Sequence, residues 1–183
     1  KIFPGGHITA CGANSPSSLA SRPVRLVLCD EVDRYPVSAG SEGDPVSLAR
    51  KRATTFWNRK IGLFSTPTNK GHSRIETAFE ESDKRFFHVP CIHCGHKQVL
   101  KWAQVRWEPD HPETAGYACE DCGTLWTDAE RVRSIRQGEW VATAESRRVA
   151  GFHISALYSP WTTLESGVIE FLEAKKQPAT LRV

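Results

Sequence analysis

The sequence predicts an α/β fold with a parallel sheet in its first half and a small zinc ribbon inserted later. Short apolar runs rich in β-branched residues alternate with segments of helical spacing, which is the pattern of a parallel sheet. Two Cys-x-x-Cys pairs follow, with 24 residues between them, a spacing typical of a zinc ribbon. The chain has 183 residues, of which 39 % are hydrophobic and 25 % charged. These values, and apolar runs of only about five residues, exclude a membrane span, a coiled coil and a disordered chain.

Strands are predicted where apolar residues alternate or run together. They fall at residues 7–11, 24–29, 60–65, 85–90 and 149–156. The run at 24–29 is nearly continuous in its apolar content, which is typical of a buried parallel strand.

Helices are predicted where a capping residue or an early proline precedes apolar residues at helical spacing. Thr127 and Glu130 form a capping box, and Thr163 caps the last helix. The helices cover residues 15–21, 44–57 and 71–84, a segment that begins at 127, and a segment from 163 to near Gln177 and Pro178.

The two cysteine pairs predict a metal site with four thiolate ligands. Gly95 and Gly123, each directly after the second cysteine of a pair, allow the tight turn that such a knuckle requires. Four protein ligands leave no position for a substrate, so the zinc is expected to be structural. The ligands are Cys91, Cys94, Cys119 and Cys122.

Other interpretations of the cysteines are a disulfide pair, a redox Cys-x-x-Cys motif, or substitution of a ligand by His93 or His96. The chain opens with no charged-then-apolar leader, which disfavours disulfides, and a redox motif has no reason to be duplicated with a glycine after each copy. Zinc is therefore preferred. Aromatic cover for so small a ribbon is expected from Trp102, Trp107 and Trp126.

The strand at 24–29 ends in two acids, Asp30 and Glu31. In P-loop nucleotide hydrolases a buried strand delivers an Asp to the Mg²⁺ shell in this way, and a following Glu can hold and polarise the attacking water. A solvated strand end gives the same pattern. Support comes from Ser65, Thr66 and Thr68 at the end of the next strand, where helicase-like and translocase ATPases sense the γ-phosphate.

In this order and spacing, the motifs resemble the large subunit of tailed-phage terminases, in the lambda-like branch. The resemblance extends over nearly the whole chain. It rests on Gly12–Pro16, Ser21-Arg22-Pro23, Leu28–Pro36, Phe64–Thr68, Cys91–Gly95 and Gly151–Pro160.

That resemblance implies a DNA-packaging motor with an ATPase and a nuclease. Asp30 corresponds to the Walker B acid, Glu31 to the catalytic carboxylate, and Ser65, Thr66 and Thr68 to the coupling motif. The implied cofactors are ATP and Mg²⁺. The implied partners are double-stranded DNA, a small terminase subunit and the portal of the procapsid, in the cytoplasm of the bacterial host.

The sequence departs from the family in holding no Gly-x-x-x-x-Gly-Lys-Ser/Thr phosphate loop and none of the nuclease acids. It also begins at Lys1 and contains no Met. We therefore expect a piece of a longer protein that is inactive alone. Residues 1–90 are expected to be the C-terminal half of the ATPase domain, 91–126 the zinc ribbon, and 127–183 the remaining helices and strand.

The formal net charge of +3 permits a nucleic-acid partner and predicts only weak, sequence-independent DNA binding. Arg22 and Arg52 flank predicted strand ends and are candidates for binding phosphates of nucleotide or DNA. The other basic clusters are expected on solvated helix faces. They are residues 50–51, 59–60, 131–136 and 147–148.

Two alternative functions remain open. A DNA helicase or restriction-type translocase shares the Asp-Glu and Ser-Thr-Pro elements, and a zinc-ribbon nucleic-acid-binding module needs neither. A phosphate loop upstream excludes the ribbon module, and a nuclease domain downstream favours a terminase over a helicase.

Overall fold

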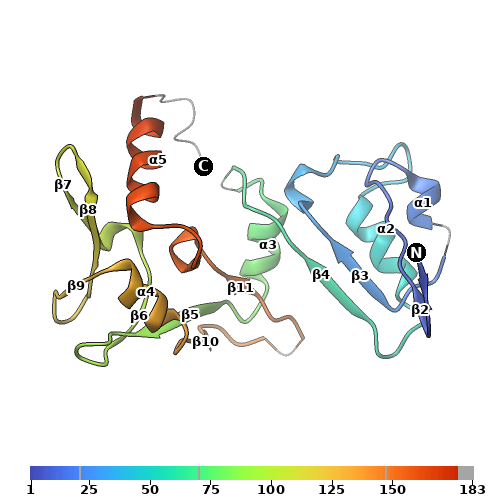
Figure 1. The fold of residues 1–183 in the computed structure, drawn as a ribbon. Helices are drawn as coiled ribbons and strands as arrows, with labels where there is room; N and C mark the ends of the chain where they lie inside the picture. The colour runs from blue at the N-terminus through green and yellow to red at the C-terminus, as the bar shows by residue number, and fades with distance from the viewer. Residues whose placement is uncertain (21, 70, 147, 177–183) are drawn as a thin grey trace. The chain divides into compact units, whose positions relative to one another are not determined.

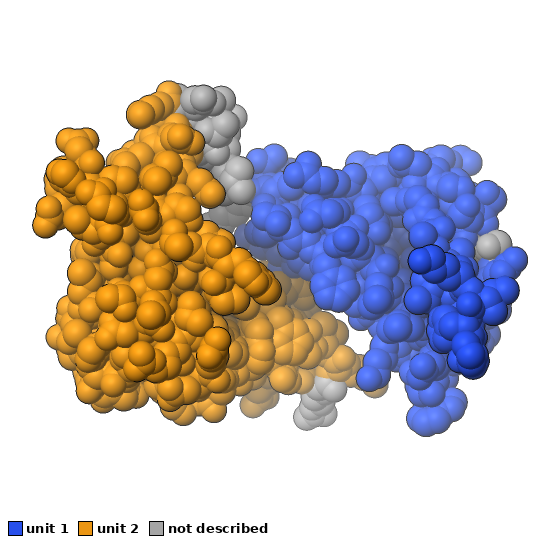
Figure 2. All heavy atoms as spheres, viewed as in Figure 1, with its two compact units in different colours: residues 1–76 blue, residues 77–183 orange. Residues whose placement is uncertain are grey.

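The computed structural model describes residues 1–20, 22–69, 71–146 and 148–176. The chain forms two compact units, residues 1–76 and 77–183, which Figure 2 colours separately. The three-part division expected at residues 90 and 126 stays a prediction. Ser21, Arg147 and the predicted helix end at Gln177 and Pro178 lie outside the described residues.

Among its described residues, the first unit contains two short sheets and three α-helices, and the last of these helices crosses the division between the units (Figure 1). Its elements are β1 (Ile2–Phe3), β2 (Gly6–His7), α1 (Pro16–Ala20), β3 (Leu26–Cys29), the 3₁₀ turn η1 (Val32–Arg34), α2 (Pro45–Arg52), β4 (Lys60–Leu63) and α3 (Arg74–Glu80).

Strands β3 and β4 pair in parallel, from Leu26 opposite Lys60 to Cys29 opposite Leu63. This confirms the predicted parallel pairing and brings the carboxyl ends of both strands to one sheet edge. Val27 and Cys29 are buried, in one core with residues of α1 and α2. Leu26 and Leu28, on the other face of β3, are 52 % and 64 % exposed. The strand is therefore buried on one face, where the expectation was both, because α1 and α2 lie against only one side of it.

Two elements of the first unit differ from those that the sequence predicts. The strand expected at residues 7–11 is replaced by a β1–β2 hairpin, because Pro4 and Gly5, with Gly5 at φ 87°, reverse the chain as in a type II turn. Helix α2 starts where predicted, with Asp44 accepting a hydrogen bond from the Ser47 amide at 2.8 Å, but it ends at Arg52 rather than near residue 57. The Thr54 hydroxyl donates to the Lys51 carbonyl at 2.8 Å, a local bond that competes with helix continuation.

The second unit is built on β5, which pairs with three strands. β10 and β6 are antiparallel to it and β11 is parallel, while β7, β8 and β9 form a separate antiparallel sheet. The strands are β5 (Arg85–Pro90), β6 (Lys97–Val99), β7 (Val105–Glu108), β8 (His111–Ala118), β9 (Leu125–Trp126), β10 (Glu139–Ala142) and β11 (Phe152–His153). The helices are η2 (Trp102–Gln104), α4 (Asp128–Ile135), η3 (Ala156–Tyr158) and α5 (Leu164–Lys176).

Helix starts in this unit follow the predicted caps. Thr127 accepts from the Glu130 amide at 3.3 Å while the Glu130 carboxylate accepts from the Thr127 amide at 2.8 Å, a complete capping box. The Thr163 hydroxyl accepts from the Ser166 amide at 3.1 Å. β5 has the predicted bounds, whereas the strand expected at 149–156 is reduced to β11.

One core joins the cysteine knuckles to the rest of the second unit. Trp126 is 1 % exposed within it, and Trp102 and Trp107 pack against Phe171 of α5. The aromatic cover predicted for the ribbon is therefore present. The Tyr158 hydroxyl ties β5 to this core, since it donates to the Phe87 carbonyl at 2.7 Å and accepts from the Leu100 amide at 2.8 Å.

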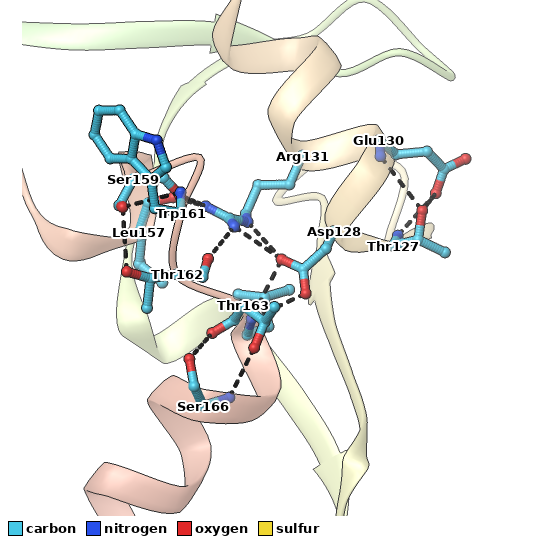
Figure 3. Close-up of polar contacts among 11 residues, drawn as sticks. Thr127, Asp128, Glu130, Arg131, Leu157, Ser159, Trp161, Thr162, Thr163 and Ser166 are labelled. Carbon is cyan, nitrogen blue, oxygen red and sulfur yellow. Dashed lines mark hydrogen bonds and ion pairs between the residues drawn. The ribbon is translucent and has the colours of Figure 1, made fainter.

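Arg131 departs from the expectation of a solvated helix face, because its side chain is 2 % exposed (Figure 3). All five of its N–H groups are used. They bind Asp128 twice, at 3.0 and 2.8 Å, and the carbonyls of Leu157, Ser159 and Thr162. The guanidinium thus fixes the segment between η3 and α5 onto α4.

Within the part of the chain that the structure describes, no helix is both long enough and apolar enough to cross a lipid bilayer.

Candidate functional site

The two predicted acids lie directly after β3, at the edge of the sheet where the parallel strands end. Asp30 and Glu31 are both exposed, and the Glu31 amide donates to Asp30 Oδ1 at 3.1 Å. Glu31 has φ 53° and ψ 46°, a left-handed conformation that is uncommon for a residue other than glycine. Strain of this kind concentrates at functional sites.

The Glu31 carboxylate faces Arg34, with 3.4 Å between Oε2 and Nε. The two side chains are 51 % and 77 % exposed. An ion pair this exposed contributes about 0–1 kcal/mol, so it does not hold Glu31 away from another partner.

The Ser-Thr-Pro-Thr motif lies at the same sheet edge, because β3 and β4 are parallel. Backbone hydrogen bonds continue past the strand ends, from the Phe64 amide to Cys29 at 2.9 Å and from the Val32 amide to Phe64 at 3.1 Å. Ser65 Oγ accepts from the Asp33 amide at 3.3 Å. Thr66 and Thr68 are exposed. The structure therefore brings the loop that carries the two acids into contact with the Ser-Thr-Pro-Thr motif.

Asp33 is the residue that joins these motifs, and sequence reasoning gave it no role. Its Oδ2 accepts from the amide of Thr68 at 3.0 Å and from the Thr68 hydroxyl at 3.1 Å. Its Oδ1 accepts from the Ile75 amide at the start of α3, at 2.9 Å. Burial works to raise the pKa of Asp33, but hydrogen bonds from Ser73, Ile75 and Thr68 outweigh it and hold the pKa below its ordinary value. The available signal was a third acid two residues beyond the Asp-Glu pair.

Arg74 clamps the same loop from α3. Its guanidinium donates to the carbonyls of Val32 and Tyr35 at 3.1 and 2.9 Å, and to that of Pro36 at 2.8 Å. It also pairs with Asp44, the cap of α2, at 3.3 Å. Arg74 thereby fixes the loop after β3 to α3 and to the start of α2. No pattern in the sequence indicated these contacts of Arg74.

Replacing Asp33 by Asn is expected to loosen the contact between the motifs. The asparagine side chain has one oxygen and one N–H₂ group, so it can accept hydrogen bonds from Thr68 or from the Ile75 amide but not from both. A buried donor that is left unpaired costs about 1–3 kcal/mol. Amide hydrogen exchange at Thr68 and Ile75, measured by NMR, is expected to become at least about fivefold faster, since 1 kcal/mol corresponds to that factor.

The matched control is Asp30→Asn, because the hydrogen bond that the Asp30 side chain accepts is a local one, from the amide of the next residue.

The pH dependence of the contact made by Asp33 has a fixed sign. The pKa of Asp33 lies below 3.8, its ordinary value. The contribution of Asp33 to the free energy of unfolding is therefore complete above about pH 4–5, and it is lost as the pH falls through the lowered pKa. Unchanged exchange at both amides in Asp33→Asn contradicts the role given to this carboxylate.

Arg22 and Arg52 lie at the other end of β3. The Val24 amide, just before β3, donates to the Arg52 carbonyl at 3.0 Å, and Arg22 stands exposed two residues earlier. The structure does not bring either arginine to Asp30 and Glu31, which stand at the carboxyl end of the strand. If Arg22 and Arg52 bind phosphates, as predicted, they do so at the opposite end of β3 from Asp30 and Glu31.

The four predicted metal ligands converge in the second unit, with all four sulfur atoms within 4.8 Å of one another. Two of the separations are 3.9 Å, between Cys91 and Cys122, and 3.8 Å, between Cys94 and Cys119. A disulfide bond requires about 2.05 Å, so the thiols are not paired in this way. The cluster can hold a metal ion.

Each knuckle has the same backbone hydrogen bonds. The Gly95 amide donates to Cys91 and the Gly123 amide to Cys119, at 2.8 and 3.1 Å. Both glycines have a left-handed φ, 80° and 70°, as their predicted role in the turn requires. His93 is directed to Glu130, at 3.4 Å, rather than to the cluster.

Comparison with known proteins identifies relatives over this whole region. Residues 1–140 match the family model described as phage terminase large subunit gpA, ATPase domain, a span that includes both the acid pair and the four cysteines. The chain is similar to the terminase large subunit of Enterobacteria phage P21, with 30 % identity over all of this chain and 32 % of the relative. It is also similar to the terminase large subunit of Escherichia phage lambda, with 29 % identity over 96 % of this chain and 31 % of the relative. The chain thus spans about a third of the length of these curated relatives. No solved structure matches it.

Proposed function

We propose, from the premise that this chain belongs to the phage terminase large subunit gpA family, that it forms part of an ATP-driven motor that packages DNA. The observation that carries the proposal is the contact, made by Asp33, between the loop that bears the acid pair after β3 and the Ser-Thr-Pro-Thr motif after β4. Family membership favours this function over the helicase and the non-enzymatic ribbon module. For the whole protein we also propose a nuclease activity, the small terminase subunit and the portal as partners, and a location in the cytoplasm of the bacterial host.

Asp30 is proposed to hold the Mg²⁺ of a bound MgATP, and Glu31 to orient the attacking water and accept its proton. Their place supports this, because ligands of open α/β sheets bind outside the carboxyl ends of the strands. When bound, Mg²⁺ would supply positive charge that stabilises the negative charge developing on the phosphates of ATP. Both carboxylates are exposed and therefore accessible to a nucleotide.

Ser65, Thr66 and Thr68 are proposed to report the state of the γ-phosphate. Thr68 is tied through Asp33 to the start of α3, so a movement of this loop reaches a helix directly. Thr66 is exposed and stands between two residues that are already bonded to Asp33. Its hydroxyl is the one left to face a ligand.

The β- and γ-phosphates must also be cradled by backbone N–H groups and a Lys, and the sequence holds no Gly-x-x-x-x-Gly-Lys-Ser/Thr loop for this. We therefore expect no ATP turnover above background from this chain by itself. Tests of the chemistry need a full-length terminase large subunit that carries these residues.

The four-cysteine cluster is proposed to bind one structural Zn²⁺. Four sulfur atoms bound to one tetrahedral zinc at about 2.3 Å would lie about 3.8 Å from one another. The sulfur–sulfur separations of 3.9 and 3.8 Å agree with it. The Gln98 side chain donates to Cys119 Sγ at 3.5 Å, as is typical for a thiolate ligand supported by a neighbouring N–H.

Thr66→Ala in such a full-length terminase is expected to reduce DNA translocation more than ATP hydrolysis. The hydroxyl is proposed to pass on the loss of the γ-phosphate, not to take part in the chemical step. The ratio of base pairs packaged to ATP hydrolysed, measured in one packaging reaction, is expected to fall about fivefold or more, the effect of losing a hydrogen bond of about 1 kcal/mol.

Thr9→Ala is the control, because Thr9 is exposed in the same unit, after β2, and lies outside the Ser-Thr-Pro-Thr motif. Equal loss of translocation and hydrolysis in Thr66→Ala contradicts the coupling role.

A further inference from the structure

The positive charge of the chain is concentrated in its first unit. Residues 1–76 contain 11 Lys and Arg against 6 Asp and Glu, a formal charge of +5, whereas residues 77–183 contain 13 against 15, a formal charge of −2. The overall +3 therefore hides a marked difference between the two units. Between Asp44 and Glu76 the sequence has no acidic residue at all.

Much of this charge gathers at the amino end of the β3–β4 sheet, which we call the basic end. Backbone hydrogen bonds bring its segments together, from the Val24 amide to Arg52 and from the Lys60 amide to Arg25, each at 3.0 Å. The basic end consists of Arg22, Arg25, Lys51, Arg52, Arg59 and Lys60.

None of these six cations makes an ion pair with a carboxylate in the described part of the chain. Five of them are exposed, and Arg52 is half-buried. Three of the unit's acids, Asp30, Glu31 and Asp33, lie at the opposite end of β3. The surface is therefore positive without local compensation, and such a surface attracts a polyanion.

Trp57 lies between Arg52 and Arg59 in the sequence and is 92 % exposed. The turn that carries it is ordered by successive hydrogen bonds, from the Phe56 amide to Ala53 at 3.1 Å and from the Arg59 amide to Phe56 at 3.3 Å. Arg59 Nη1 also donates to the Phe56 carbonyl at 3.3 Å. The exposed indole can provide apolar contact, and the cations near it in the sequence can neutralise phosphates, two of the contacts that nucleic-acid-binding surfaces use.

We propose that the basic end binds the backbone of duplex DNA, with the cations on phosphates and Trp57 against the sugars. This rests on the proposed function for the identity of the polyanion, and it extends that function by assigning the surface. The basic end and the coupling motif are then the two ends of one strand, since Lys60 begins β4 and Ser65 follows it. Four residues of strand span only about 13 Å, so a shift of β4 moves both.

The test is the binding of the full 183-residue chain to a fluorescein-labelled duplex of random sequence, measured by anisotropy without nucleotide at several salt concentrations. In Lys51→Gln/Arg59→Gln/Lys60→Gln we expect at least about tenfold weaker binding at low salt. The plot of log K against log salt is expected to become shallower by about 0.9 for each phosphate that the variant no longer neutralises. Trp57→Ala is expected to weaken binding about fivefold or more, because the apolar contact of the indole with the sugars is lost.

The second unit offers matched controls. Arg133, Arg136 and Arg148 are exposed and make no ion pair among the described residues, and Trp161 is 91 % exposed. Arg133→Gln/Arg136→Gln/Arg148→Gln and Trp161→Ala are expected to bind as the unaltered chain does. Circular dichroism checks that each variant is folded.

Equal loss in the matched variants, no loss in the basic-end variants, or no binding by the unaltered chain each overturns the proposal. Because no nucleotide is present, a failure of the roles given to Asp30 and Glu31 leaves this result unchanged and is recognised separately.

Discussion

Removal of metal from the four-cysteine cluster is expected to unfold the second unit. Cys91 and Cys119 are 2 % and 3 % exposed, within the same core as Val89 and Trp126. Without a metal this core must hold four sulfur groups within 4.8 Å of one another, with no bond between them. Structural zinc in small domains supplies about 10–16 kcal/mol, which is as large as the whole stability of a typical domain, about 5–15 kcal/mol.

The measurement is tryptophan fluorescence during titration with a strong chelator, under reducing conditions. Trp126 is buried beside Tyr117, with 5.2 Å between the ring centres, so its emission is expected to shift to longer wavelength as the unit opens. Cys119→Ser is expected to reproduce the shift without chelator. Cys11→Ser is the control, because Cys11 is an exposed free thiol in the other unit. Soluble, reduced protein that contains no metal and does not respond to chelator contradicts the zinc assignment.

The parts of the fold that follow from local sequence could be predicted closely. The capping box at Thr127 and Glu130 depends on residues three apart, and it formed as expected. The bounds of β5 also agreed. By contrast, the end of α2 depends on a hydroxyl of Thr54 that competes for a helix carbonyl, and Arg131 is buried because carbonyls about 30 residues away receive its donors. Neither outcome is visible in the spacing of apolar residues.

The candidate sites divide in the same way. Cysteine spacing and the two glycines predict the metal cluster, because ligand chemistry fixes both. The acid pair and the Ser-Thr-Pro-Thr motif could also be found, since each directly follows an apolar strand. The role of Asp33 could not, because its partner Thr68 is 35 residues away and only the parallel pairing of β3 with β4 brings the two together. The net charge of +3 does not show how the charge is distributed, because it sums a unit of formal charge +5 and a unit of formal charge −2.

Glu31→Gln in a full-length terminase large subunit that carries these residues is expected to reduce ATP hydrolysis about 10²-fold or more. A positioned general base contributes on the order of 10²–10⁴, and a glutamine keeps the shape of the side chain but cannot accept the proton. ATP binding is expected to persist, because the phosphates are held by other groups. Asp30→Asn is expected to weaken the Mg²⁺-dependent step instead, since it removes the carboxylate proposed to hold the metal.

Glu42→Gln is the matched control, as Glu42 is an exposed glutamate in a loop of the same unit. The most direct test of the central claim, that Asp30 and Glu31 are the hydrolytic acids, is a single-turnover measurement in Glu31→Gln with enzyme in excess over ATP, alongside the ATP dissociation constant. The claim predicts an unchanged dissociation constant and a hydrolysis rate at least about 10²-fold lower than in Glu42→Gln. A hydrolysis rate equal to that of Glu42→Gln contradicts it.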